Sequence, residues 1–233
     1  MSSALNSEQS QILTPLLTAD PGKPFVVAQL GQSLDGRIAT VSGESRYING
    51  EAALDHLHLL RAHVDAVVVG AGTIAADNPR LNVRRGPVQS RPARVAIDPT
   101  GRLGTDYRWL DPDGARCLVV TTDPSKSFGR AEVVPMSHRD GMIAPADIVA
   151  ALFARGMRKL LIEGGARTIS NFIDAGCIDR LHLLVAPVII GSGKSGLDLA
   201  PVAQLDRAMR PPTRVFPLSG GDVLFDCDLS GGR

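Results

Sequence analysis

The chain has 233 residues, of which 44% are hydrophobic and only 4% aromatic, so a globular core must be built mainly from aliphatic side chains. Its net charge of +1 argues against binding through a strong positive field to nucleic acid or to an anionic membrane. Three scattered cysteines without a CxxC pair support neither a metal site nor a disulfide framework. With no signal-peptide pattern at the start of the sequence, we expect a cytoplasmic protein.

From Phe25 onward, short apolar runs bounded by Gly, Pro or Asp alternate with segments of helical periodicity. The predicted strands are Phe25–Leu30, Ala66–Gly70, Arg94–Asp98, Cys117–Thr122, Lys159–Glu163 and Leu181–Ile190. The predicted helices are Gly50–Ala62, Pro145–Arg155 and Ala166–Ala175. Alternating strands and helices predict an α/β fold with a largely parallel sheet.

The two ends of the chain depart from this alternation. Thr213–Leu218 and Asp222–Leu229 read as strands joined by Ser219–Gly221, which leaves no room for a helix and predicts an antiparallel hairpin. Residues 1–22 carry a weak helical pattern and are interpreted as an N-terminal extension. Residues 23–233 are expected to form a single domain, because no linker divides them.

Three glycine-rich turns are candidate phosphate-binding sites. The run Gly70–Ala75 fits G-x-G-x-x-A, but Pro79 stops any long helix after it, which argues against a Rossmann motif. The run Gly191–Gly196 resembles the end of a Walker A loop, but Val188 stands where that motif needs glycine, so a simple loop is expected. The pair Gly164 and Gly165 fits an ordinary tight turn and a pyrophosphate site equally well.

Several polar residues occupy unusual positions. Arg61 shares the apolar face of its helix, where a guanidinium either reaches solvent at the helix end or clamps an anion. The histidines show no metal-ligand spacing, and His56 and His58 are expected on the solvated side of their helix. No metal site is predicted.

A series of motifs follows one order along the chain: Ser33–Ala39, Gly43–Ile48, Leu60–Ala62, Val69–Thr73, Asp77–Leu81, Val83–Arg84, Glu163–Gly165, Asp179–Leu181 and Ala186–Pro187. This order and spacing resemble the reductase half of the bifunctional riboflavin biosynthesis deaminase/reductase family, from Lys23 to the C-terminal hairpin. The resemblance implies a dihydrofolate reductase-like fold, a three-layer α/β/α arrangement whose mixed sheet ends in antiparallel strands.

The resemblance also implies an activity, the NADPH-dependent reduction of 5-amino-6-(5-phosphoribosylamino)uracil. Hydride would add at ribose C1′ of the ring-opened imine to give the ribitylamino product. The family resemblance implies a homodimer as well. Because the sequence contains neither the H-x-E nor the P-C-x-x-C segment of a zinc deaminase, a separate deaminase protein is expected in the pathway.

The resemblance assigns site residues by position. The cofactor would contact Gly31, Tyr47, Thr73 and Asp77, and its pyrophosphate Gly164, Gly165, Ala166, Arg167 and Thr168. Tyr47 is a mild departure, since the bacterial family more often has Trp there. The substrate would contact Ser45, Arg61, Leu81, Arg84 and Glu163.

Particular roles follow for some of these residues. Arg61 and Arg84 are expected to grip the 5-phosphate, and Asp77 is proposed as a proton donor or imine stabiliser. The turn Thr121–Lys126 is the expected place for the 2′-phosphate of NADPH, because it offers hydroxyl groups and a cation.

Two other functions remain open from the sequence. One is a reductase of the same fold that acts on another pyrimidine or pterin substrate, such as dihydrofolate. Arg84 favours a phosphoribosyl substrate, because dihydrofolate has no phosphate for it to bind. The other is a non-catalytic module that binds a nucleotide as a sensor.

Overall fold

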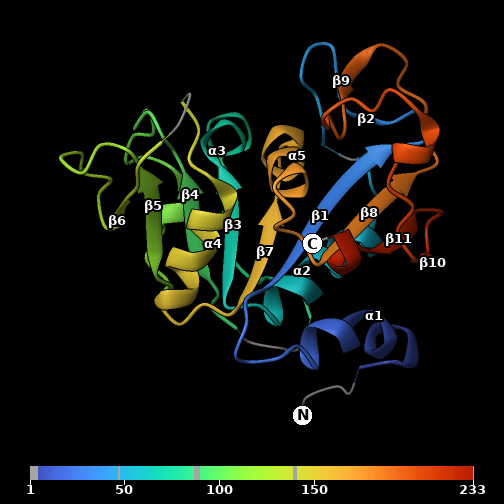
Figure 1. Cartoon of the computed structure of the whole chain (residues 1–233), viewed down its shortest axis with the longest axis horizontal. Helices are drawn as coiled ribbons and strands as arrows, with labels where there is room; N and C mark the ends of the chain where they lie inside the picture. Colours follow the sequence, from blue (N-terminus) through green and yellow to red (C-terminus); the bar gives the residue numbers. More distant parts are fainter. Residues whose placement is uncertain (1–4, 47, 87–89, 139–140, 233) are drawn as a thin grey trace.

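A computed structural model describes residues 5–46, 48–86, 90–138 and 141–232. A nine-stranded sheet forms its centre, with the strand order β10-β11-β8-β1-β7-β3-β4-β5-β6 (Figure 1). The strands are β1 Phe25–Ser33, β3 Ala66–Gly70, β4 Ala93–Ile97, β5 Cys117–Thr121, β6 Glu132–Pro135, β7 Lys159–Glu163, β8 Arg180–Ala186, β10 Thr213–Pro217 and β11 Val223–Asp228. Neighbouring strands are parallel from β8 to β6, whereas β11 runs antiparallel to both β8 and β10. The predicted mixed sheet with an antiparallel C-terminal hairpin is therefore confirmed.

Helices cover both faces of this sheet. They are α1 Ser7–Leu17, α2 Glu51–Ala62, α3 Ala71–Asp77, α4 Pro145–Ala154 and α5 Ala166–Asp174, with short 3-10 turns η1 Arg108–Leu110, η2 Leu205–Arg207 and η3 Ser230–Gly232. Apolar residues of α1, α2 and α3 pack in one core, and those of α4 and α5 pack in the other. This arrangement confirms the three-layer α/β/α architecture.

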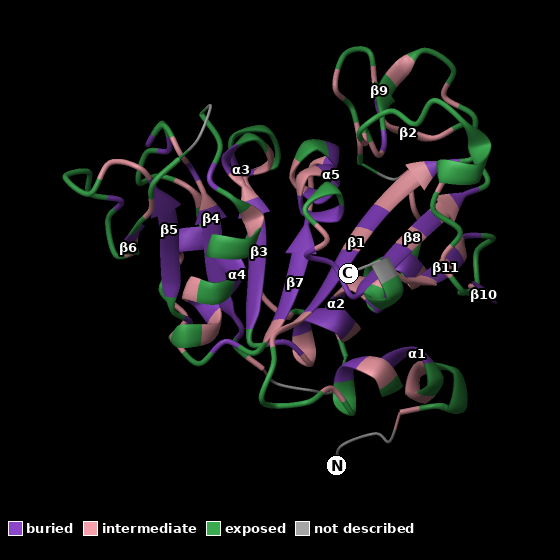
Figure 2. Ribbon diagram, viewed as in Figure 1, coloured by how far each residue is buried: buried purple, intermediate pink, exposed green. Residues whose placement is uncertain are grey.

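The middle strands are buried along most of their length because both of their faces are covered (Figure 2). In β3, Val67 and Val69 point into the core beneath α1 to α3, whereas Ala66 and Val68 point into the core beneath α4 and α5. Successive strand residues face opposite sides, so one short run of valines supplies both cores.

The segment interpreted as an N-terminal extension contributes to the core. Asn6 caps α1, and its side chain accepts a hydrogen bond from the Gln9 N–H. Leu13 has no exposed surface and packs with the apolar residues of α2 and α3. The described part of residues 1–22 is therefore a packed helix rather than a loose tail.

The structure contains three strands that the sequence pattern did not predict. One is β6, and the others are β2 Arg37–Thr40 and β9 Gly193–Ser195, which form a separate two-stranded antiparallel sheet. The expectation of a simple loop over Gly191–Gly196 was therefore wrong. The predicted strand Leu181–Ile190 ends earlier, at Ala186, because the next residue is Pro187 and cannot donate a backbone hydrogen bond. Among the described residues, no helix has the length and apolar character needed to cross a membrane.

His56 and His58 are buried, contrary to the expectation of a solvated helix face. His56 is 5% exposed because α2 lies against the sheet, where its Nε2 is 3.0 Å from Nδ1 of His182 on β8. His182 lies next to the carboxylate of Asp226, which also accepts hydrogen bonds from Arg180 and Arg214. Although burial opposes the charge, His182 and Arg180 hold the pKa of Asp226 well below its ordinary value.

This burial predicts a stability loss in acid. Burial, assisted by the neighbouring His182, lowers the pKa of His56 from 6.5 to about 3, so the folded protein holds this ring neutral. As the pH falls below 6.5, this histidine takes up a proton in the unfolded chain but not in the folded protein. The free energy of unfolding therefore decreases from pH 6.5 toward pH 3. We expect His56 alone to account for a loss of about 2 kcal/mol in the free energy of unfolding between pH 7 and pH 5.

Urea denaturation of the wild type and of His56→Gln at the two pH values measures this contribution. The amide can still hydrogen-bond to His182, and the variant should show a smaller difference between pH 7 and pH 5. His138→Gln, at an exposed position, is the control and should behave as the wild type does. Equal pH dependence in His56→Gln and wild type would contradict the assignment.

Candidate active site

A cleft of about 910 Å³ opens at the carboxyl ends of β1, β3, β4 and β7. Ligands of open α/β sheets bind at this edge, because the loops that follow parallel strands converge there. Most residues assigned by the family resemblance line this cleft, namely Gly31, Ser45, Thr73, Asp77, Leu81, Glu163, Gly164, Gly165, Ala166, Arg167 and Thr168. Arg61 and Arg84 are not among the lining residues, and Tyr47 lies outside the described residues.

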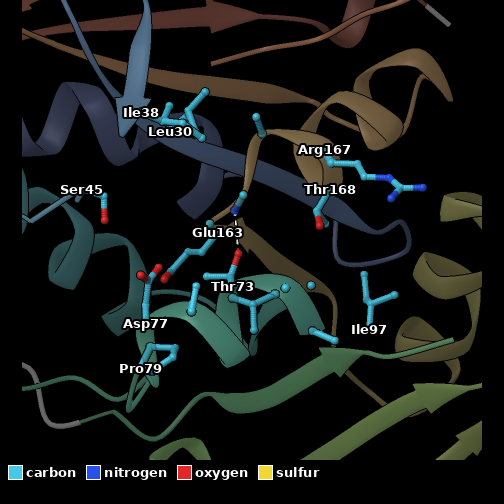
Figure 3. A pocket seen from close by; sticks show the side chains of 18 of the residues that line it. Leu30, Ile38, Ser45, Thr73, Asp77, Pro79, Ile97, Glu163, Arg167 and Thr168 are labelled. Carbon is cyan, nitrogen blue, oxygen red and sulfur yellow. Dashed lines mark hydrogen bonds between the residues drawn. The ribbon is translucent and has the colours of Figure 1, made fainter. Parts of the chain in front are cut away.

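The centre of the cleft is a cradle formed by Gly164, Gly165 and Thr73 (Figure 3). The Gly165 N–H donates a hydrogen bond of 2.8 Å to Oγ1 of Thr73. Gly164 has φ +88°, and a Cβ atom there would lie 2.7 Å from Cγ2 of Thr73. Only glycine fits this position without displacing Thr73, so the backbone of the turn is left open toward the cleft.

Helix α5 begins directly behind this cradle. Its first N–H groups have no carbonyl partner within the helix, and the helix dipole adds partial positive charge at the same end. The hydroxyl of Thr168 packs against the end of β3, because a Cβ atom on Gly70 would lie 2.5 Å from the Oγ1 atom of Thr168. The arrangement of small residues and free N–H groups fits the pyrophosphate of a dinucleotide.

Glu163 and Arg61 form a buried ion pair beside the cleft. Nε and Nη2 of Arg61 each donate a hydrogen bond of 2.6 Å to Glu163, and Nη1 donates to the carbonyl oxygen of Asn82 at 3.0 Å. Both side chains are only 6% exposed. The geometry differs from the expectation that Arg61 grips a phosphate, because this guanidinium is held by the protein itself.

Arg84 lies outside this pair and is exposed. Its backbone N–H donates to Nδ1 of the buried His58, and its Nη1 donates to Oδ1 of Asn82. Although the side chain is exposed, the surrounding protein removes part of its hydration, and this desolvation, followed by the repulsion of Arg61 and other arginines nearby, lowers the pKa of Arg84. Such crowding of positive charge favours an anion close to Arg84.

The loop after α3 holds two residues in the left-handed region. Asn78 has φ +42°, and its side chain accepts the backbone N–H of Arg108. Leu81 has φ +55°, an uncommon value for a bulky side chain, and is buried while lining the cleft. Backbone strain of this kind occurs often at ligand-binding sites.

Comparison with known proteins identifies the family. The sequence model described as the RibD C-terminal domain matches residues 24–211. This chain belongs to the RibD C-terminal domain family. The resemblance inferred from the sequence motifs is thereby confirmed.

Similar proteins include longer chains and one that this chain covers completely. A riboflavin biosynthesis protein RibD of Aquifex aeolicus is 31% identical over 87% of this chain and 57% of its own length. A 2,5-diamino-6-ribosylamino-4(3H)-pyrimidinone 5′-phosphate reductase of Methanothermobacter thermautotrophicus is 28% identical over 90% of this chain and 100% of its own. The chain thus spans somewhat more than half of RibD and the whole length of the archaeal reductase.

A solved structure with a similar fold comes from Thermotoga maritima. It is a diaminohydroxyphosphoribosylaminopyrimidine deaminase/5-amino-6-(5-phosphoribosylamino)uracil reductase, with a TM-score of 0.76 and 26% identity. The match covers 94% of this chain and 59% of the Thermotoga protein. Only part of the bifunctional protein therefore corresponds to the RibD C-terminal domain described here.

One wall of the cleft in this RibD C-terminal domain was not predicted from the sequence. The two-stranded sheet of β2 and β9 rises above the end of β1 (Figure 1) and carries Ala39 and Lys194 into the cleft lining. Asp35 anchors it by accepting the N–H groups of Ile190 and Gly191. The Ser33 hydroxyl and these N–H groups lower the pKa of Asp35 to about 2, so the anchor stays ionised.

Proposed function

We propose that this chain is an NADPH-dependent reductase of a phosphoribosylamino-pyrimidine, specifically 5-amino-6-(5-phosphoribosylamino)uracil. The supporting observation is that one cleft brings together a dinucleotide cradle and two carboxylates, Glu163 and Asp77. Figure 3 shows both carboxylates at the same end of the cleft, on the opposite side of Thr73 from Arg167. A cofactor lying across the cradle would extend toward them.

The residues of the cradle fit the cofactor. Gly164 and Gly165 leave space for the pyrophosphate, and Ala166 and Arg167 at the start of α5 line the same part of the cleft. When bound, the reduced nicotinamide supplies the hydride for carbon C1′ of the substrate. The contribution of the chain is then to hold the two reactants in line and to exclude water from between them.

Within this proposal, Arg61 positions Glu163 instead of holding phosphate. The bidentate ion pair fixes the position of the Glu163 carboxylate beside the cleft. Arg84, which is exposed and lies among other arginines, is the better candidate for the 5-phosphate. Ser45 and Leu81 complete the proposed substrate contacts.

The test is an activity assay that follows loss of reduced-nicotinamide absorbance. Each reaction contains the purified protein, NADPH and one candidate substrate. The candidates are the uracil compound, its undeaminated 2,5-diaminopyrimidinone counterpart and dihydrofolate. The undeaminated compound is included because the archaeal reductase named for it matches this chain over its whole length. Oxidation with the uracil compound supports the proposal, whereas oxidation with the undeaminated compound alone would keep the reductase function and contradict the specific substrate. Oxidation with dihydrofolate alone, or tight NADPH binding without any turnover, would favour the alternative functions.

Asp77→Asn tests the proposed proton donor. Asp77 is exposed in the cleft lining, and the amide keeps its size while removing its acid function. We expect kcat to fall by about 100-fold or more, because general acid catalysis contributes this much, while the Kd for NADPH changes little. Asp111→Asn, at an ion pair on the surface away from the cleft lining, is the control and should keep full activity. Full turnover by Asp77→Asn would remove the proposed role.

The proposal also includes a homodimer, a separate deaminase and a cytoplasmic location. The outermost strand, β10, leaves one backbone edge unpaired within the described sheet, and Val215 on it is 53% exposed. Pairing with a second copy along this edge would satisfy the unpaired backbone groups of β10 and shield Val215.

A further inference from the structure

The loop that follows β4 forms the end of the cleft opposite the two carboxylates. Pro99, Thr100 and Arg102 of this loop line the cleft together with Arg167 and Thr168 of α5. In Figure 3, Ile97, Arg167 and Thr168 lie on one side of Thr73, and Asp77 and Ser45 lie on the other. The cradle therefore separates the end of the cleft that holds Glu163 and Asp77 from the end that holds Arg102 and Arg167.

This loop is braced by hydrogen bonds. The Asp98 carboxylate accepts the Leu103 N–H at 2.8 Å, and the Gly101 N–H donates to the Asp98 carbonyl oxygen at 3.1 Å. From the neighbouring segment, the Thr122 hydroxyl donates to the Pro99 carbonyl oxygen at 2.7 Å. An exposed arginine on such a loop starts from a fixed backbone, so less conformational entropy is lost when it binds a ligand.

Lys126 belongs to this bracing. Its ammonium group donates to the carbonyl oxygens of Thr100 and Gly101, at 3.3 and 2.7 Å. Gly101 has φ +61°, and a Cβ atom there would collide with the Lys126 side chain. The expectation that Thr121–Lys126 binds the 2′-phosphate therefore needs correction, because its cation supports the adjacent loop.

Arg102 has no such internal use. Within the described parts of the chain, its guanidinium forms no ion pair or hydrogen bond, and the residue is exposed. Its Nη2 lies near the first turn of α3, 3.5 Å from where a Cβ atom on Gly72 would be. Arg102 therefore offers a free guanidinium inside the cleft, on the side of the cradle away from Asp77.

We propose that Arg102 binds the 2′-phosphate of the cofactor and makes the site selective for NADPH over NADH. The inference rests on the proposed function, in which the nicotinamide lies toward Glu163 and Asp77. With the pyrophosphate on the cradle, the adenosine half must then extend the other way, toward Arg102. A guanidinium forms charge-assisted hydrogen bonds to a phosphate dianion, whereas the ribose hydroxyl of NADH offers no charge. Thr100 adds a hydroxyl group to the same wall of the cleft.

Binding titrations without any pyrimidine test this assignment. Calorimetry would compare NADPH with NADH, and adenosine 2′,5′-bisphosphate with adenosine 5′-monophosphate, on the wild type and on Arg102→Ala. We expect the variant to bind the two 2′-phosphorylated ligands about 10- to 100-fold more weakly and the other two unchanged. Arg158→Ala, an exposed arginine at the opposite end of the sheet, should bind all four ligands as the wild type does.

Other results would overturn the assignment. Equal weakening of NADPH and NADH would place Arg102 at a part shared by both cofactors, and unchanged binding of all four ligands would place the 2′-phosphate elsewhere. Because these titrations contain no substrate, their outcome is separate from that of the reductase assay. Selective NADPH binding by a protein without reductase activity would support the role of Arg102 while contradicting the proposed function.

Discussion

Replacing Arg61 by Ala is expected to lower the free energy of unfolding by about 3–5 kcal/mol. The substitution would leave the Glu163 carboxylate, which is 6% exposed, without its two hydrogen bonds from the guanidinium. It would also remove the hydrogen bond from Arg61 to the Asn82 carbonyl oxygen, which joins α2 to the loop after α3. Urea denaturation, followed by the fluorescence of the buried Trp109, measures the change.

A surface ion pair provides the matched control. Arg85 bonds to Glu51 and Asp55, both of which are well exposed, so Arg85→Ala should cost no more than about 1 kcal/mol. In the Arg61→Ala background, Glu163→Gln should restore part of the lost stability, because it removes the uncompensated charge. A loss near that of Arg85→Ala would mean that Arg61 is not structurally required and would return it to consideration as a phosphate ligand.

The Arg61 result also bears on the reaction. An arginine that held only phosphate would affect substrate binding and leave the fold intact. An arginine that positions Glu163 should affect stability and turnover together, with little change in the Kd for NADPH. Measuring these quantities on one variant separates the two roles.

Local sequence patterns were sufficient to predict most of the fold. The valines of β3 and the apolar run of β7 are each bounded by polar or glycine residues, which indicates strands buried on both faces. The C-terminal hairpin was predictable because the link between its strands is too short for a helix. The short strand β6 was missed, since it has only four residues and two of them are exposed.

Contacts between distant residues were beyond such reasoning. Arg61 and Glu163 lie 102 residues apart, and only the folded chain shows that they satisfy each other. His56 was placed on a solvated face because helical periodicity alone does not reveal that the sheet covers that side of α2. The sheet of β2 and β9 pairs short segments that are distant in the sequence, Arg37 and Ser195 being 158 residues apart, and β9 has no strong apolar pattern.

The turn that forms the glycine cradle could be predicted from the sequence, but its function could not. A strand, two glycines and an amphipathic helix indicated a turn open to an anion, yet this pattern fitted an ordinary turn equally well. The contact between Gly165, in the turn after β7, and Thr73 of α3, 92 residues away, was not readable from this pattern and supports the proposed phosphate site. This contact joins the turn after β7 to α3 and holds Thr73 so close to position 164 that only glycine fits there.

Gly164→Ala is accordingly expected to weaken NADPH binding by about tenfold or more and to lower stability by about 1–3 kcal/mol. The stability loss arises because alanine disfavours φ +88° and because its Cβ would lie 2.7 Å from Cγ2 and 2.9 Å from Oγ1 of Thr73. Thr73 must move, which disturbs its hydrogen bond with Gly165 and places a methyl group where the pyrophosphate would lie. Titration with NADPH and urea denaturation measure the two effects.

Gly156→Ala separates the backbone strain from the effect on the cradle. Gly156 has φ +85°, close to that of Gly164, but nothing lies within 4 Å of the Cβ position. This control should lose about 1 kcal/mol of stability and bind NADPH as the wild type does. Adding Thr73→Ser to Gly164→Ala removes the Cγ2 atom that the new methyl group meets and keeps the hydroxyl, so it should recover part of both losses. If Gly164→Ala resembled Gly156→Ala in NADPH binding, the turn after β7 would not be the pyrophosphate site, and the proposed orientation of the cofactor, with Arg102 at its adenosine end, would lose its basis.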